Sequence, residues 1–154
     1  MYRLKGSSES CKWLERKYKG FVNTLKTLTL KIDLPYSVEV VWNIISDVTR
    51  CDWVPSVESI SLDDNVRSFS MEGIGEVQEK ILLKDPETHT LQYTAIETPS
   101  PLEHHLATIE LETSAEGCLL QWTSEIAPEQ FGDAIAHGMQ ISLDGLKRVL
   151  SDLE

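Results

Sequence analysis

A long apolar stripe near the end of the chain constrains the fold more than any other feature of the sequence. After Pro128, which suits the first turn of a helix, apolar and small side chains recur every three or four residues. Such a stripe must be buried, so the predicted helix needs a second layer of structure to pack against. The stripe consists of Phe131, Ile135, Met139, Ser142, Leu143, Leu146, Val149, Leu150 and Leu153.

The segments before this helix supply that layer, because their alternating patterns predict antiparallel strands. Turn sequences separate them, for example Asp85-Pro86-Glu87-Thr88 and Ser114-Ala115-Glu116-Gly117. Between the first two strands, Ser37 can cap a short helix. The order of elements predicts an α+β domain whose last helix packs on one face of the sheet. The predicted strands cover residues 24–34, 57–62, 67–71, 76–84, 91–98, 103–113 and 118–126.

Three motifs narrow the fold further. Residues 41–62 read VWNIISDVTRCDWVPSVESISL, residues 75–80 read GEVQEK with Asp85 following in the same hairpin, and Tyr93 and Trp122 add aromatic positions. Together they resemble the polyketide cyclase/dehydrase-like branch of the START and birch-pollen-allergen superfamily (SRPBCC). The resemblance implies a helix-grip fold, in which a curved antiparallel sheet of about six to seven strands wraps around the long C-terminal helix. It also implies a ligand cavity between the two.

Charge divides the chain into two parts. Residues 1–31 carry a net charge of +6 and residues 32–154 a net charge of −17. We therefore predict a basic N-terminal arm over residues 1–22, as a short helix or disordered, and a helix-grip ligand-binding domain over residues 23–154. The arm can be a solvated leader, lie on its own acidic domain, or make transient membrane contact. The acidic domain argues against nucleic acid as a partner.

Strand alternation predicts which side chains face the cavity, because residues two apart share one face of a sheet. Trp53 is expected near the cavity mouth, where packing and a lid role are the two alternatives. Gly138, on the inward stripe of the helix, can leave room for a ligand, whereas close approach to the sheet is the alternative for Gly138 and Gly145. The predicted ligand-binding residues are Trp53, Val77, Glu79, Ile81, Leu91, Tyr93, Ala95, His105, Ala107, Ile109, Leu120, Trp122, Ile135, Gly138, Met139 and Ser142.

Glu79 and His105 are the polar residues of most interest on this face. The resemblance implies that both positions line the pocket, as they do in the related plant hormone receptors, although those receptors have tyrosine at the position of His105. An unpaired buried carboxylate is costly. Glu79 therefore either pairs with a nearby His, Tyr or Lys, or meets a polar group of the ligand, and the second hypothesis is favoured. His105 can equally be a hydrogen-bonded core residue.

The function predicted from these patterns is binding of a small hydrophobic ligand, such as a lipid, polyketide or isoprenoid-like molecule, by a carrier or sensor. A cofactor-free cyclase, aromatase or dehydratase is the first alternative, with Glu79, His105 and Tyr93 as candidate catalytic residues in general acid–base chemistry. A protein-interaction module is the second. No metal site is expected, since the four histidines and three cysteines lack ligand spacing. The sequence shows no transmembrane stretch or apolar signal core, which favours a cytoplasmic location.

Overall fold

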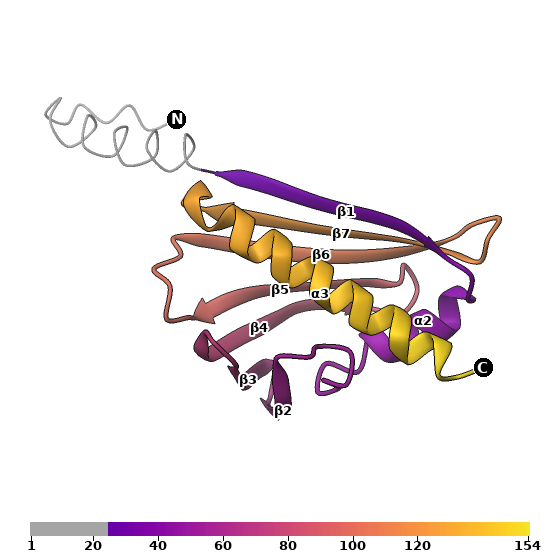
Figure 1. Ribbon diagram of the computed structural model, residues 1–154, viewed down its shortest axis with the longest axis horizontal. Helices are drawn as coiled ribbons and strands as arrows, with labels where there is room; N and C mark the ends of the chain where they lie inside the picture. The colour runs from indigo at the N-terminus through magenta and orange to yellow at the C-terminus, as the bar shows by residue number, and fades with distance from the viewer. Residues whose placement is uncertain (1–24) are drawn as a thin grey trace, which may run out of the picture.

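The computed structural model of the protein describes residues 25–154 (Figure 1). The predicted basic arm over residues 1–22 lies outside the described residues. The described chain holds the strands β1 (Lys26–Leu34), β2 (Val57–Asp63), β3 (Val66–Met71), β4 (Gly75–Asp85), β5 (Thr90–Glu97), β6 (His104–Thr113) and β7 (Cys118–Ala127), the helices α2 (Val38–Ile45) and α3 (Gly132–Ser151), and the short 3-10 helix η1 (Glu129–Phe131).

The strands form one antiparallel sheet of seven strands in the order β1-β7-β6-β5-β4-β3-β2. Neighbouring strands are joined by hairpins except at β1, which pairs with the last strand, β7, from Lys26 opposite Ile126 to Leu34 opposite Cys118. Figure 1 shows α3 lying across one face of this curved sheet. The α+β helix-grip architecture predicted from the sequence is therefore confirmed.

The short helix α2 forms where the sequence placed it. Ser37 caps its first turn, and the Ser37 hydroxyl accepts a hydrogen bond from the backbone N–H of Val40 at 3.3 Å. Its buried face includes Val41, Trp42 and Ile45. Figure 1 shows α2 beside the C-terminal half of α3, where it fills one end of the space between helix and sheet.

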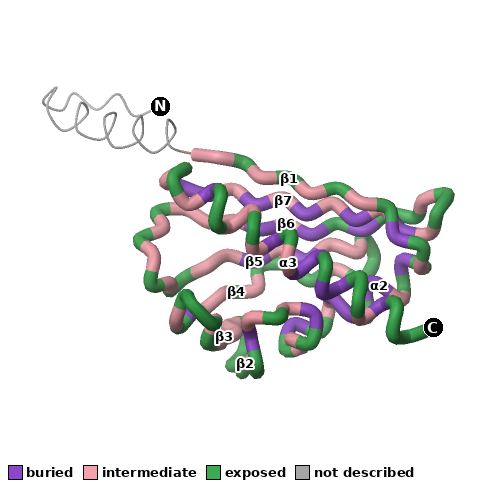
Figure 2. The backbone as a smooth tube through the Cα atoms, viewed as in Figure 1, coloured by how far each residue is buried: buried purple, intermediate pink, exposed green. Residues whose placement is uncertain are grey.

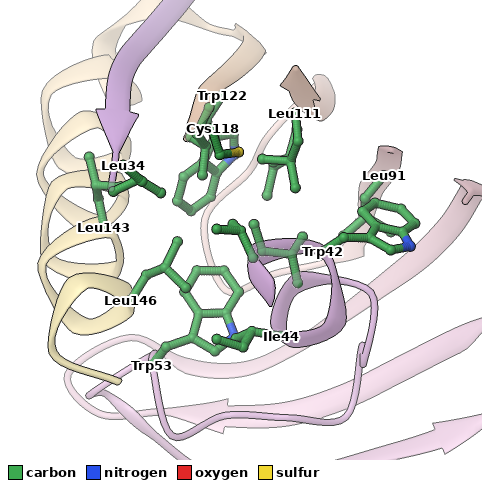
Figure 3. Packing of buried hydrophobic residues seen from close by; sticks show 14 of the residues in the cluster. Leu34, Trp42, Ile44, Trp53, Leu91, Leu111, Cys118, Trp122, Leu143 and Leu146 are labelled. Atoms are coloured by element: carbon green, nitrogen blue, oxygen red, sulfur yellow. The ribbon is translucent and has the colours of Figure 1, made fainter. Parts of the chain in front are cut away.

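The hydrophobic core gathers at this end of the sheet, as the burial pattern in Figure 2 shows. Leu91 on β5, Ile109 on β6 and Leu120 on β7 are each about 1% exposed and belong to one cluster with α2 and the second half of α3. Figure 3 shows side chains of this cluster, including Leu143 and Leu146 of α3. Among the described residues, no helix is long and apolar enough to span a membrane.

Candidate functional site

A cavity of about 310 Å³ lies at the opposite end, between the first half of α3 and the strands β2 to β7. Its wall is mostly apolar, with a few polar side chains from the sheet. Exposed Ile74, at 51%, stands at its rim. The lining residues are Arg50, Trp53, Val54, Val57, Ile60, Arg67, Phe69, Met71, Ile74, Val77, Glu79, Tyr93, Ala95, Thr98, Ser100, Leu102, His105, Trp122, Ser124, Phe131, Ala134, Ile135, Gly138, Met139 and Ser142.

The structure brings most of the predicted ligand-binding residues to this cavity. Those that line it are Trp53, Val77, Glu79, Tyr93, Ala95, His105, Trp122, Ile135, Gly138, Met139 and Ser142. Five others lie outside it, and the structure corrects their assignment: Ile81, Leu91, Ala107, Ile109 and Leu120. These five do face the same side of the sheet. Leu91, Ile109 and Leu120 belong to the core that α2 and the second half of α3 fill, whereas Ile81 and Ala107 stand opposite Tyr93 and lie outside the cavity lining.

Glu79 is paired within the protein, and its partner is Arg67 rather than a histidine, tyrosine or lysine. Nε of Arg67 donates to Oε1 of Glu79 at 2.8 Å, and Nη2 lies 2.8 Å from the same oxygen. The two residues stand opposite each other on β3 and β4. The hypothesis that Glu79 waits without a protein partner for a ligand group is therefore wrong.

Arg67 organises this polar corner through two further contacts. Its Nη1 donates to the carbonyl oxygen of Val48 at 3.3 Å, and its guanidinium carbon lies 4.7 Å from the centre of the Tyr93 ring. Burial raises the pKa of the Glu79 carboxyl above its ordinary value, and the Arg67 charge and hydrogen bond oppose that rise. The pair thus places one balanced set of charges in the cavity wall.

Tyr93 and His105 are neighbours on β5 and β6, with ring centres 6.0 Å apart. Burial, followed by the Glu79 charge, raises the pKa of Tyr93, so the phenol stays protonated. Burial, with a smaller contribution from His104, lowers the pKa of His105 to about 4, so the imidazole is neutral at physiological pH. Nδ1 of His105 accepts a hydrogen bond from the backbone N–H of Ala95 at 2.9 Å.

The His105 side chain replaces a backbone hydrogen bond between β5 and β6 where these strands are no longer paired. The paired residues of β5 and β6 end at Tyr93 opposite Ala107, and beyond that point the His105 side chain and its carbonyl oxygen bond Ala95 and Thr94. A second hollow of about 290 Å³ lies at this gap, and His105, Ala95 and Leu102 border both spaces. His105 therefore forms part of the wall between the cavity and the hollow.

The two glycines of α3 lack a side chain for different structural reasons. A Cβ at Gly138 would meet nothing within 4 Å, so this position opens the cavity wall. A Cβ at Gly145 would lie 2.1 Å from the carbonyl oxygen of Trp53. Gly145 thus permits close approach to the loop that carries Trp53, rather than to the sheet.

Sequence reasoning missed several lining residues, above all Arg67. The sequence predicted this strand, β3, but not which of its side chains point inward. Arg67, Phe69 and Met71 alternate along the strand, and all three line the cavity. Extending the alternation argument to β3 would have placed them together opposite Glu79. Ser124, which is 2% exposed, shares the inward phase predicted for Leu120 and Trp122, so alternation already placed it on this face although it was not among the predicted residues.

Within residues 25–154, no group of three or more His, Cys, Asp or Glu side chains is arranged to hold a metal ion. Of the cysteines in this range, Cys51 is half-buried and Cys118 is buried, and both are free thiols. The chemistry of the cavity therefore depends on its apolar wall, the Arg67–Glu79 pair and a few neutral donors.

The fold is that of a known class. Residues 26–151 match the family described as polyketide cyclase/dehydrase and lipid transport. The chain belongs to this family, and through it to the START and birch-pollen-allergen superfamily that its motifs indicated. No protein with a curated description matches the chain.

Solved structures support the same fold. The chain is similar to the protein XoxI from Bacillus cereus, with 24% identity and a TM-score of 0.69 over 84% of this chain and 97% of that one. It is also similar to norcoclaurine synthase from Thalictrum flavum, solved with dopamine and hydroxybenzaldehyde, with 16% identity and a TM-score of 0.67 over 84% and 88% of the two chains. At these identities the similarity establishes the fold alone.

Proposed function

We propose that the protein binds a small hydrophobic ligand, such as a lipid, polyketide or isoprenoid-like molecule, in this cavity and acts as a cytoplasmic carrier or sensor. The observation that carries the proposal is the cavity itself. Its volume of about 310 Å³ is at the low end of ligand pockets, and its wall is apolar with a few polar groups, as such sites usually are. Membership of a family that includes lipid transport supports the same function.

The arrangement of polar groups favours a carrier over an acid–base enzyme. In a cyclase or dehydratase, Glu79 would work with His105 or Tyr93 on a bound carbonyl compound. In this structure Glu79 bonds Arg67, and His105 bonds the backbone of Ala95. The enzyme alternative keeps one supporting observation, which is that Tyr93 and His105 border the same cavity with their rings adjacent.

Filling the cavity from α3 tests the proposal. Because a Cβ at Gly138 meets open space, Gly138→Leu should place a side chain in the cavity without disturbing the fold. We expect it to abolish binding of the neutral fluorescent probe N-phenyl-1-naphthylamine, measured by titration, while the circular dichroism spectrum stays unchanged.

The matched control is His137→Leu, which adds the same side chain at the neighbouring exposed position of α3. It should leave probe binding as in the unsubstituted protein. If Gly138→Leu binds the probe with unchanged affinity, the ligand does not occupy this cavity and the proposal fails.

A further inference from the structure

The cavity contains hydrogen-bond donors that the described part of the protein does not satisfy. The indole Nε1 of Trp122 is buried and has no hydrogen-bond partner, although the residue is only 6% exposed and lines the cavity. A buried N–H without an acceptor is unfavourable, so it favours a ligand that supplies one. Trp53 has the same property, but Figure 3 shows its nitrogen beside Ile44 of α2.

The Tyr93 hydroxyl is a second donor at this place. The indole N–H of Trp122 is directed at the oxygen of this hydroxyl, outside full hydrogen-bond geometry. Burial and then the Glu79 charge raise the pKa of Tyr93 more strongly than the Arg67 charge and this N–H together lower that pKa. Nε and Nη2 of Arg67 both lie 2.8 Å from Oε1 of Glu79, so the partner of that carboxylate is Arg67 rather than Tyr93. The phenol therefore stays protonated and available to a ligand.

His105 supplies a third donor, which follows from its hydrogen bond. Because Nδ1 accepts the N–H of Ala95, the neutral imidazole carries its proton on Nε2. His105 borders the cavity, and its ring is adjacent to that of Tyr93. Residues with neutral donors, on β5, β6 and β7, thus line one cavity.

The charges of the wall are already balanced. Of the two arginines that line the cavity, Arg67 pairs with Glu79, and Arg50 pairs with Asp52 through contacts of 2.7 and 2.8 Å. An anionic ligand would leave water without meeting an unpaired cation, which is unfavourable. A ligand with a neutral hydrogen-bond acceptor therefore fits this cavity wall better than an anionic ligand does.

We propose that the ligand presents a neutral carbonyl oxygen, as in a ketone or ester, to the Tyr93 hydroxyl and the Trp122 indole N–H, with the Nε2–H of His105 as a third donor. This inference rests on the proposed function and specifies the ligand class for the same cavity. It separates carbonyl compounds from pure hydrocarbons and from fatty-acid carboxylates.

Three probes with one skeleton test the choice of polar group: 2-acetylnaphthalene, 2-ethylnaphthalene and 2-naphthoate. One satisfied buried hydrogen bond is worth about 1.4 kcal/mol, so the ketone should bind about tenfold more tightly than the ethyl compound in calorimetric titrations. The carboxylate should bind more weakly than the ketone.

Tyr93→Phe removes only the hydroxyl, and it should lower the ratio of the ketone affinity to the 2-ethylnaphthalene affinity toward one. Tyr36→Phe is the matched control, because the Tyr36 hydroxyl bonds Glu154 at the surface. If Tyr93→Phe does not fold, Trp122→Phe replaces it, with Trp42→Phe as the control in the filled core.

Each outcome has a distinct meaning. Equal affinities for ketone and hydrocarbon in the unsubstituted protein would overturn the carbonyl inference and leave the proposed function standing. A carboxylate that binds more tightly than the ketone would also overturn it and point to Arg67 as an anion site. If none of the three probes binds, the proposed function itself fails.

Discussion

The two ends of the space between α3 and the sheet are built on the same strands but differ in what fills them. At one end, α2 inserts its apolar face, and Leu91, Ile109 and Leu120 pack into a dry core. At the other end no element of the described chain occupies the corresponding place, and the next inward positions of the same strands, such as Tyr93 and Trp122, border the cavity.

The difference shows that the alternation of a strand determines which face a side chain lies on, whereas its position along the strand determines what it contacts. Alternation selects the face on which a side chain lies, for example both Leu91 and Tyr93 on β5. The position along the strand decides whether that side chain meets α2 or open space. A residue can therefore be buried for stability at one end and serve a ligand at the other.

The largest expected effect is at the filled end. Leu146→Ala should lower the free energy of unfolding by about 2–5 kcal/mol, because Leu146 is 1% exposed and its loss leaves a cavity among close-packed neighbours. Ile135→Ala, at the hollow end of the same helix, should cost clearly less. Urea unfolding of both variants checks this, and equal losses would mean that the two ends are packed alike.

The ion pair at the hollow end gives the next effect. Glu79→Gln should destabilise the protein by about 1–3 kcal/mol, since it leaves the mostly buried Arg67 charge without its counter-charge. The control is Asp52→Asn, which removes the partner of a more exposed arginine and should cost less than about 1 kcal/mol. A neutral effect of Glu79→Gln in thermal melts would show that solvent in the cavity compensates the pair.

The lowered pKa of His105 predicts that the stability of the protein depends on pH. Its folded pKa of about 4 lies below the ordinary 6.5, so between these values the unfolded chain binds more protons. The stability that His105 contributes is therefore complete above about pH 6.5 and is lost as the pH falls toward 4, by roughly 3 kcal/mol. In His105→Asn, whose amide oxygen can still accept the Ala95 N–H, the decline over this range should be smaller. An identical pH profile for both proteins would contradict the assigned burial.

The smallest effect distinguishes the two glycines of α3. Gly138→Ala should stabilise the protein by about 0.5–1 kcal/mol, because alanine favours the helix and its Cβ meets open space. Gly145→Ala should instead destabilise it, since its Cβ would overlap the Trp53 carbonyl oxygen. Thermal melts with the same sign for both variants would refute this contrast.

The sequence by itself determined the order of elements, the antiparallel sheet and the inward face of the strands β4 to β7. Alternation and helical spacing are local patterns set by backbone geometry, so they can be read without knowing how the layers meet. The cap at Ser37, the inward phase of Glu79 and the apolar stripe of α3 are examples that the structure reproduces.

Only the tertiary structure decided what each inward residue meets. It paired Glu79 with Arg67 across β3 and β4, it assigned Leu91 and Ile109 to the core rather than the cavity, and it gave Gly145 a neighbour in the Trp53 loop. These contacts join residues far apart in sequence. They depend on where α2 ends and where α3 crosses the sheet, which packing of the whole domain settles and no local pattern records.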